Sequence, residues 1–129
     1  MGIQDEALRL HANGYNCAQS VLTACREYTG LPDETALALS AGFGGGVRCG
    51  EICGAVSGAV MALGMHYPFS DGTDAAAKNR IGRLAGELTS TFAEEYGCIR
   101  CQDLKRKGIC CDTLIAYAAK LAEEKMKEE

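Results

Sequence analysis

The chain has 129 residues, of which 47% are hydrophobic and 23% are charged, and its formal net charge is −4. A chain of this length folds as one domain and buries roughly two-thirds of the surface that its unfolded form exposes, so its core needs no disulfide staples. A negative net charge argues against a nucleic-acid-binding surface, which needs a basic face. We therefore expect one domain over residues 1–129, with a solvated tail at about residues 123–129 and no nucleic-acid partner.

The N-terminal segment lacks the basic and apolar runs of a secretory signal. The apolar segment 51–65 is shorter than the roughly 20 residues that a transmembrane helix needs. From these features we expect a cytoplasmic protein without a membrane partner.

Helical periodicity dominates the chain, and no run of residues alternates as a half-buried strand does. Turn and capping residues separate the helical segments, namely Asn13-Gly14, Asn16 as an N-cap, Gly30-Leu31-Pro32, Asp33 as a cap, and Gly97. The expected helices cover about residues 4–12, 16–29, 33–41, 51–65, 74–96 and 111–125. The predicted fold is an all-α bundle of five to six helices.

The segment 51–65 is apolar almost all round, which is typical of a helix at the centre of a bundle. Small residues recur at every fourth position, at Gly50, Gly54, Gly58 and Ala62, and such a stripe lets neighbouring helices approach the backbone closely. The preceding Gly42-Phe-Gly-Gly-Gly predicts a turn or close-approach loop, because neither a dinucleotide fingerprint nor a phosphate-loop lysine accompanies it.

Eight cysteines stand out, at positions 17, 25, 49, 53, 98, 101, 110 and 111. Disulfide frameworks belong to secreted chains, and exposed thiols in a reducing cytoplasm are prone to oxidation and metal scavenging. The number of cysteines therefore favours a metal or redox function. His11 and His66 are too few for a histidine-based site, and we expect His11 on the surface.

Three cysteines fall at expected helix starts. Cys17 follows the N-cap, Cys53 lies in the first turn of the central helix, and Cys111 opens the last helix. The positive end of a helix favours a thiolate, so we expect these thiols to ionise more readily than a free cysteine. Cys101 lies in an expected basic loop from Cys98 to Cys110, where positive charge acts in the same direction.

The other cysteines give weaker signals. Cys49 lies four residues before one of these thiols, and Cys98 lies three residues before Cys101, a spacing used by redox dithiols and metal knuckles. Cys110 is adjacent to the cysteine that opens the last helix, and neighbouring helical residues seldom bind one ion together. We expect Cys25 to be a buried, inert thiol.

The order and flanking residues of the cysteines resemble those of a known family. The segments that carry the resemblance are Gly14-Tyr-Asn-Cys17-Ala-Gln, Gly42-Phe-Gly-Gly-Gly, Cys53-Gly-Ala-Val-Ser-Gly58, Cys101-Gln-Asp-Leu104 and Cys111. The family is C_GCAxxG_C_C, named for its cysteine pattern and described as redox-active, and the likeness runs from about residue 7 to residue 122.

This resemblance implies an all-helical redox domain, related to one in split-Soret type cytochromes that is associated with an iron–sulfur centre. It also implies which cysteines are shared with the family, namely Cys17, Cys53, Cys101 and Cys111. Cys49, Cys98 and Cys110 are additional thiols in this chain, which could replace or extend that ligand set.

Three functions fit these features. The first is an iron–sulfur cluster, such as [2Fe–2S], bound by Cys17, Cys53, Cys101 and Cys111 for electron transfer or redox sensing. The second is a metal-free thiol–disulfide relay that uses Cys98 with Cys101, or Cys17 with Cys53. The third is a structural zinc ion on the four shared sulfurs. The expected partner is a redox protein or a small-molecule electron donor or acceptor, and the sequence leaves oxidoreductase activity and oligomeric state open.

Overall fold

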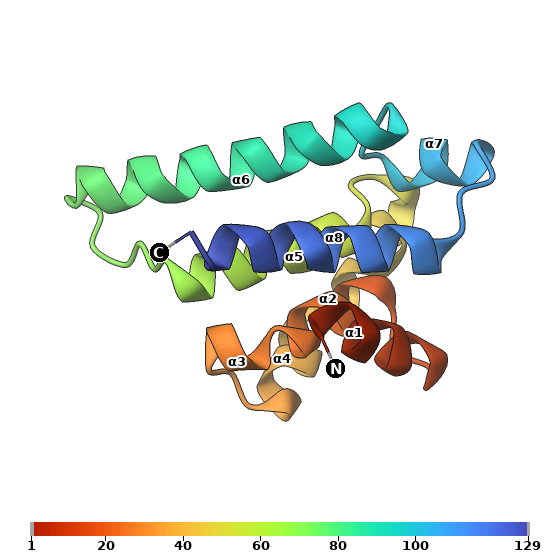
Figure 1. Cartoon of the computed structure of the whole chain (residues 1–129), viewed down its shortest axis with the longest axis horizontal. Coiled ribbons are helices and arrows are strands. Elements are labelled where there is room, and N and C mark those ends of the chain that lie inside the picture. Colours follow the sequence, from red (N-terminus) through yellow and green to blue (C-terminus); the bar gives the residue numbers. More distant parts are fainter. Residues whose placement is uncertain (1, 129) are drawn as a thin grey trace.

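The computed structural model of the protein describes residues 2–128 and consists of helices (Figure 1). The α-helices are α1 (Ile3–Ala12), α2 (Cys17–Ala24), α3 (Arg26–Thr29), α4 (Asp33–Ser40), α5 (Gly54–His66), α6 (Ala75–Tyr96), α7 (Cys101–Arg106) and α8 (Cys111–Met126). A 3-10 turn (Ala41–Phe43) and a π-type turn (Gly46–Gly50) connect α4 to α5. The all-α prediction is confirmed, but residues 2–128 form eight α-helices rather than five to six. None of these helices has both the length and the apolar character needed to cross a membrane.

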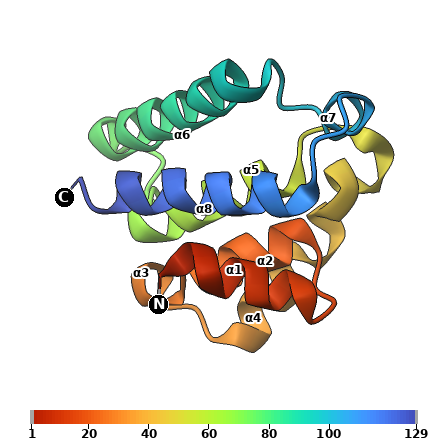
Figure 2. The same ribbon diagram turned by 45° about the vertical axis from the view of Figure 1, so that its right-hand side comes forward.

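Helices α5 and α8 lie side by side and form the middle of the molecule (Figures 1 and 2). Helix α6 covers one side of this pair, and α1 to α4 cover the other, where α1 contacts α8 and α2 contacts α5. The predicted central position of the small-residue helix is confirmed, because α5 contacts α2, α3, α6 and α8. The connection between α4 and α5, helix α7 and the start of α8 meet at one end of the molecule, at the right in Figure 1.

Helix α2 approaches α5 closely at a glycine. A Cβ atom on Gly58 would lie 2.7 Å from the Ala18 carbonyl oxygen and 3.2 Å from the Val21 Cβ atom, closer than side chains ordinarily pack. A larger residue at Gly58 would therefore push the two helices apart. The predicted stripe of small residues is confirmed at Gly54 and Gly58, whereas Gly50 precedes the helix.

Helix α2 begins where the sequence predicts because Asn16 caps it. The Asn16 side-chain oxygen accepts a hydrogen bond from the Gln19 amide (2.9 Å), and the Gln19 side chain accepts one from the Asn16 amide (3.1 Å). This reciprocal arrangement satisfies two amide groups at the helix start. The Asn16 side chain also donates to the Ala41 carbonyl oxygen (2.9 Å), which ties the start of α2, and with it Cys17, to the chain that follows α4.

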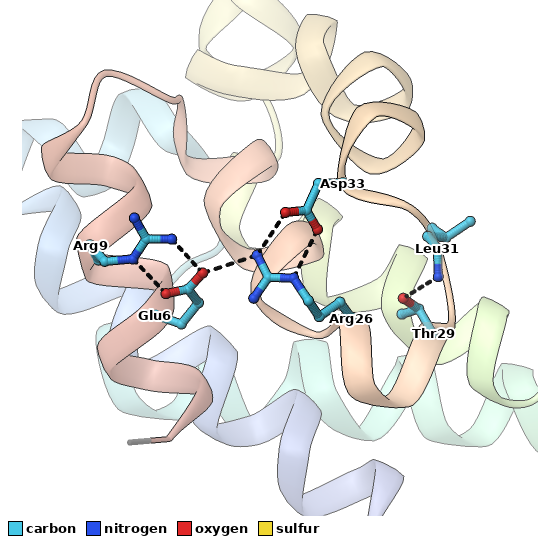
Figure 3. Close-up of polar contacts among 6 residues, drawn as sticks. All are labelled: Glu6, Arg9, Arg26, Thr29, Leu31 and Asp33. Carbon is cyan, nitrogen blue, oxygen red and sulfur yellow. Dashed lines mark hydrogen bonds and ion pairs between the residues drawn. The ribbon is translucent and has the colours of Figure 1, made fainter.

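A chain of ion pairs joins α1, α3 and α4 (Figure 3). Arg26 donates two hydrogen bonds to Asp33 (2.8 and 3.2 Å) and contacts Glu6 at 3.0 Å. Hydrogen bonds from two arginines lower the pKa of Glu6 to about 2, and the bond from Arg9 has a larger effect than the bond from Arg26. Asp33 was expected to cap α4, but its carboxylate binds Arg26 instead, and Pro32 occupies the position before the helix.

Three helix boundaries differ from the prediction. The expected second helix is divided at Cys25, where a ψ of 16° interrupts the α conformation, into α2 and α3. The central helix starts at Gly54 rather than at residue 51, because residues 51–53 are extended and pair with residues 99–101. The segment 98–110, expected as a loop, contains α7.

The solvated tail is shorter than predicted. Helix α8 continues to Met126, whose side chain is buried, and the Tyr67 hydroxyl donates to the Lys125 carbonyl oxygen (2.6 Å). Lys125 also forms an ion pair with Glu87 of α6. These contacts hold the end of α8 against its neighbours, and Glu129 lies outside the described residues.

We expect Gly58→Ala to lower the free energy of unfolding by about 1–3 kcal/mol, because the added methyl group meets the Ala18 carbonyl oxygen. The matched control is Gly64→Ala in the same helix, where no atom lies within 4 Å of the added Cβ atom. Helix propensity predicts that this control keeps or gains stability, by up to about 1 kcal/mol. Urea unfolding followed by circular dichroism measures both variants, and equal stabilities would show that α2 and α5 do not depend on this contact.

Candidate functional site

The four cysteines that the resemblance singles out line one cavity. Cys17, Cys53, Cys101 and Cys111 all contribute to the wall of a space of about 220 Å³, which we call the cysteine cavity. The other residues of its wall are His11, Asn16, Gly45, Arg48, Lys105, Ile109 and Leu114. The fold therefore brings together thiols that lie far apart in the sequence.

Each of these four cysteines stands at the start of a helix. Cys17, Cys101 and Cys111 are the first residues of α2, α7 and α8, and Cys53 directly precedes α5. The sequence predicted three such positions, and α7 adds the fourth. Helices that begin at one end of the molecule thus present their first side chains to a common space.

A short pairing of two extended segments holds Cys53 beside Cys101. The Cys53 amide donates to the Ile99 carbonyl oxygen (2.7 Å), and the Cys101 amide donates to the Glu51 carbonyl oxygen (2.6 Å). An ion pair between Arg100 and Glu51 at 3.1 Å supports the same pairing. The sequence gives no signal for this pairing, because each segment is too short to show an alternating strand pattern.

Gly54 allows Cys17 to lie against the start of α5. A Cβ atom on Gly54 would collide with the Cys17 sulfur and would lie 2.9 Å from the Phe43 carbonyl oxygen. Glycine is therefore the residue that leaves room for the thiol at this position. The Cys17 sulfur occupies the space beside the residue that follows Cys53 in the chain.

The glycine cluster forms a left-handed turn on the rim of the cavity. Gly45, Gly46, Val47 and Arg48 have φ values between 59° and 65°. This region suits glycine but costs other residues about 1–3 kcal/mol each, so the backbone is strained at Val47 and Arg48. The predicted turn is confirmed, and Gly45 and Arg48 line the cysteine cavity.

Burial opposes the ionisation of two cavity thiols. Cys53 is 4% exposed, and burial raises its pKa to about 12, which hydrogen bonds from the first amides of α5 oppose only in part. Cys111 is exposed as a whole residue, yet its thiol is partly desolvated. This desolvation is the largest cause that raises the pKa of Cys111, and the nearby Cys17 thiol raises it further. Lys105 lowers the pKa of Cys111 but does not cancel these two effects. The predicted easier ionisation is therefore wrong for Cys53 and Cys111, because desolvation exceeds the effect of the helix end.

The other four cysteines lie outside the cysteine cavity. Cys25 is fully buried, and burial raises its pKa to about 12, as expected of an inert core thiol. Cys98 packs against the core, and Cys110 is exposed just before α8. Cys49 is exposed and lines a neighbouring pocket with Cys101. The predicted early helix start, which would have put Cys49 on a face of the central helix, does not occur.

Two polar residues of the cavity wall, His11 and Arg48, were not predicted from the sequence. His11 was expected on the surface, but it is partly buried and lines the cavity, with its Nδ1 atom 2.7 Å from the Asp112 Oδ1 atom. Its position depends on the packing of α1 beside α8, for which no local pattern exists. Arg48 carried no signal of its own, because a single arginine after a glycine cluster matches no motif.

The four cysteines line a space rather than converge on one point. Within residues 2–128, no group of three or more cysteine, histidine or carboxylate side chains is placed so that it could hold a metal ion. The cavity of about 220 Å³ is also several times larger than the roughly 30 Å³ that one water molecule occupies in the liquid. The arrangement offers four soft donors and room for a group larger than one ion.

Comparisons with known proteins agree with the cysteine pattern. A family model described as "Putative redox-active protein (C_GCAxxG_C_C)" matches residues 15–125. The matched region contains the four cavity cysteines and leaves His11 outside. No curated protein and no solved structure matches the chain significantly.

We expect the folded, reduced, metal-free protein to react with iodoacetamide fastest at Cys49 and Cys110, which are exposed. Cys25 and Cys53 should react slowest, because they are buried and their pKa values are raised to about 12, and the thiolate is the reactive form. Mass spectrometry of samples taken at successive times measures the labelling rate of each cysteine. In urea, where the protein is unfolded, the differences between these rates should disappear. Rapid labelling of Cys53 in the folded protein at neutral pH would contradict its burial.

Proposed function

Because the chain belongs to the C_GCAxxG_C_C family, we propose that it is a redox protein that holds an iron–sulfur cluster on Cys17, Cys53, Cys101 and Cys111. The observation that carries this proposal is the shared cavity, which four thiols from four helix starts line together. Four thiolates are the usual ligands of a [2Fe–2S] cluster, which supplies one-electron transfer. The protein would act in electron transfer or redox sensing, with a redox protein or a small-molecule donor or acceptor as its partner.

The wall of the cysteine cavity suits such a group. Ile109 and Leu114 supply apolar surface that limits contact with water, and solvent access is one of the factors that set a cluster's potential. Arg48 and Lys105 contribute positive charge to the same wall, which offsets the negative charge of four thiolates. Gly54 keeps the space beside Cys17 free of a side chain.

The protonation of the thiols couples metal loading to pH. Ligand thiols must lose their protons, and the pKa values of Cys53 and Cys111 are raised in the metal-free fold. Each of these thiols therefore releases a proton when it becomes a ligand. Loading is accordingly favoured at higher pH and opposed at lower pH.

The two alternatives have less support. A relay between Cys98 and Cys101 has less support because Cys98 does not line the cavity that Cys101 lines. A relay between Cys17 and Cys53 needs an accessible thiolate, whereas Cys53 is buried and its pKa is raised to about 12. A structural zinc ion would use the same four cysteines as ligands, but a single ion fills less of a cavity of about 220 Å³ than a cluster does.

We expect protein purified without oxygen to be coloured and to contain iron and acid-labile sulfide. Cys111→Ser should lower the iron and sulfide content at least about tenfold, because it removes one ligand. Cys110→Ser is the matched control, since Cys110 is the neighbouring residue, is exposed and does not line the cavity. Iron, zinc, sulfide and thiol assays on the same samples measure the effect.

Each contradictory outcome has a distinct signature. A colourless protein with stoichiometric zinc would favour the structural zinc site. A colourless, metal-free protein that reversibly loses two thiols on mild oxidation would favour the relay. Equal loss of iron in the variants of Cys110 and Cys111 would show that these thiols serve folding rather than a cluster.

We also expect Gly54→Ala to lower the iron content although all eight thiols remain. The added methyl group meets the Cys17 sulfur and displaces it from the cavity wall. Gly64→Ala should load fully, because its Cβ atom meets nothing within 4 Å. Iron per folded chain, with folding checked by circular dichroism, is the measurement, and full loading of Gly54→Ala would show that the shape of the cavity is not required.

A further inference from the structure

We infer that a small molecule bearing an oxyanion group, such as a phosphate or a carboxylate, binds between Arg48 and Lys105 at the side of the cysteine cavity. The site is a second, more open space of about 450 Å³, which we call the outer pocket. Its wall consists of Gly45, Arg48, Cys49, Gly50, Cys101, Gln102 and Lys105. This inference goes beyond the proposed function and does not require that the cysteine cavity holds a cluster.

Both cations of the outer pocket lack a hydrogen-bonding or ion-pairing partner among the described residues. Neither the Arg48 nor the Lys105 side chain makes a hydrogen bond or an ion pair within residues 2–128. Cations close by in the chain behave differently, since Arg100 pairs with Glu51 and Arg106 lies 3.7 Å from Asp103. Arg48 and Lys105 are therefore available to a ligand, whereas the charges of Arg100 and Arg106 are already balanced by carboxylates.

The surroundings of these two cations favour an anion. The chain has 17 acidic and 13 basic residues, yet within residues 2–128 no carboxylate side chain lines either the outer pocket or the cysteine cavity. Arg48 and Lys105 line both spaces. A concave wall with charge of one sign concentrates ions of the opposite sign. A guanidinium group and an ammonium group together suit the oxygen atoms of a phosphate or carboxylate.

The backbone holds Arg48 at this position at the expense of strain. Val47 and Arg48 have φ values of 59° and 61°, which non-glycine residues rarely adopt. Strained residues persist where the surrounding structure fixes them, and they are concentrated at functional sites such as ligand clamps. Gln102, whose side chain carries an amide group, also contributes to the wall.

The outer pocket would place its ligand next to the cysteine cavity. Cys101 lines both spaces, so a bound oxyanion would lie beside one of the four cavity thiols.

The test is a titration of the full-length, anaerobically purified protein with inorganic phosphate and, separately, with acetate, at constant ionic strength set by chloride. The changes in amide chemical shift should reach a plateau as the probe concentration rises. They should be confined to residues 45–50 and 101–105. Arg48→Gln and Lys105→Gln should each weaken binding of the stronger probe at least about tenfold. Arg106→Gln is the matched control, because Arg106 follows Lys105 in the chain, lies near Asp103 and lines neither space, and it should change binding less than about twofold.

The phosphate and acetate titrations show which oxyanion the site prefers. Absence of saturation with both probes, or equal weakening by Arg106→Gln and Lys105→Gln, would overturn the inference. It would also be overturned if the Arg48 and Lys105 variants lost iron and sulfide while no oxyanion bound, because the two cations would then serve the cluster alone. Saturable binding to a colourless, metal-free protein would support the outer pocket even though the proposed cluster had failed.

Discussion

The close contact between α2 and α5 is the constraint on which the arrangement of the site depends. Two glycines of α5 let α2 approach without an intervening side chain. Because α2 begins at Cys17 and α5 follows Cys53, the same contact brings their thiols to one cavity. The pairing of residues 51–53 with residues 99–101 then adds Cys101, and the packing of α8 along α5 adds Cys111.

The electrostatics of the cavity follow from burial more than from helix ends. A helix start stabilises a thiolate by a modest amount that solvent weakens, whereas loss of hydration destabilises the charged form directly. At Cys53 the second effect is larger, and the pKa rises to about 12. The metal-free fold therefore keeps this thiol protonated and unreactive. Under the proposed function, a metal centre bound here would reverse the balance, because its charge favours the thiolate over the thiol.

Charge is distributed unevenly around the site. The chain as a whole is acidic, but within residues 2–128 the walls of the cysteine cavity and the outer pocket carry cations and no carboxylate. The acidic residues near this end, such as Glu51 and Asp103, are turned to other partners, Arg100 and Arg106. Arg48 and Lys105 therefore have a role in both proposals. In the cysteine cavity they would offset thiolate charge, and in the outer pocket they would attract an oxyanion.

The sequence by itself determined the features that depend on near neighbours in the chain. These are the helical class, the cap at Asn16, the glycine turn, the small-residue stripe and the buried state of Cys25. Only the tertiary structure decided where α5 starts, that His11 lines the cysteine cavity, and in which direction the pKa of Cys53 shifts. Each of these depends on segments that are distant in the chain and meet only on folding, so no local spacing or periodicity encodes it.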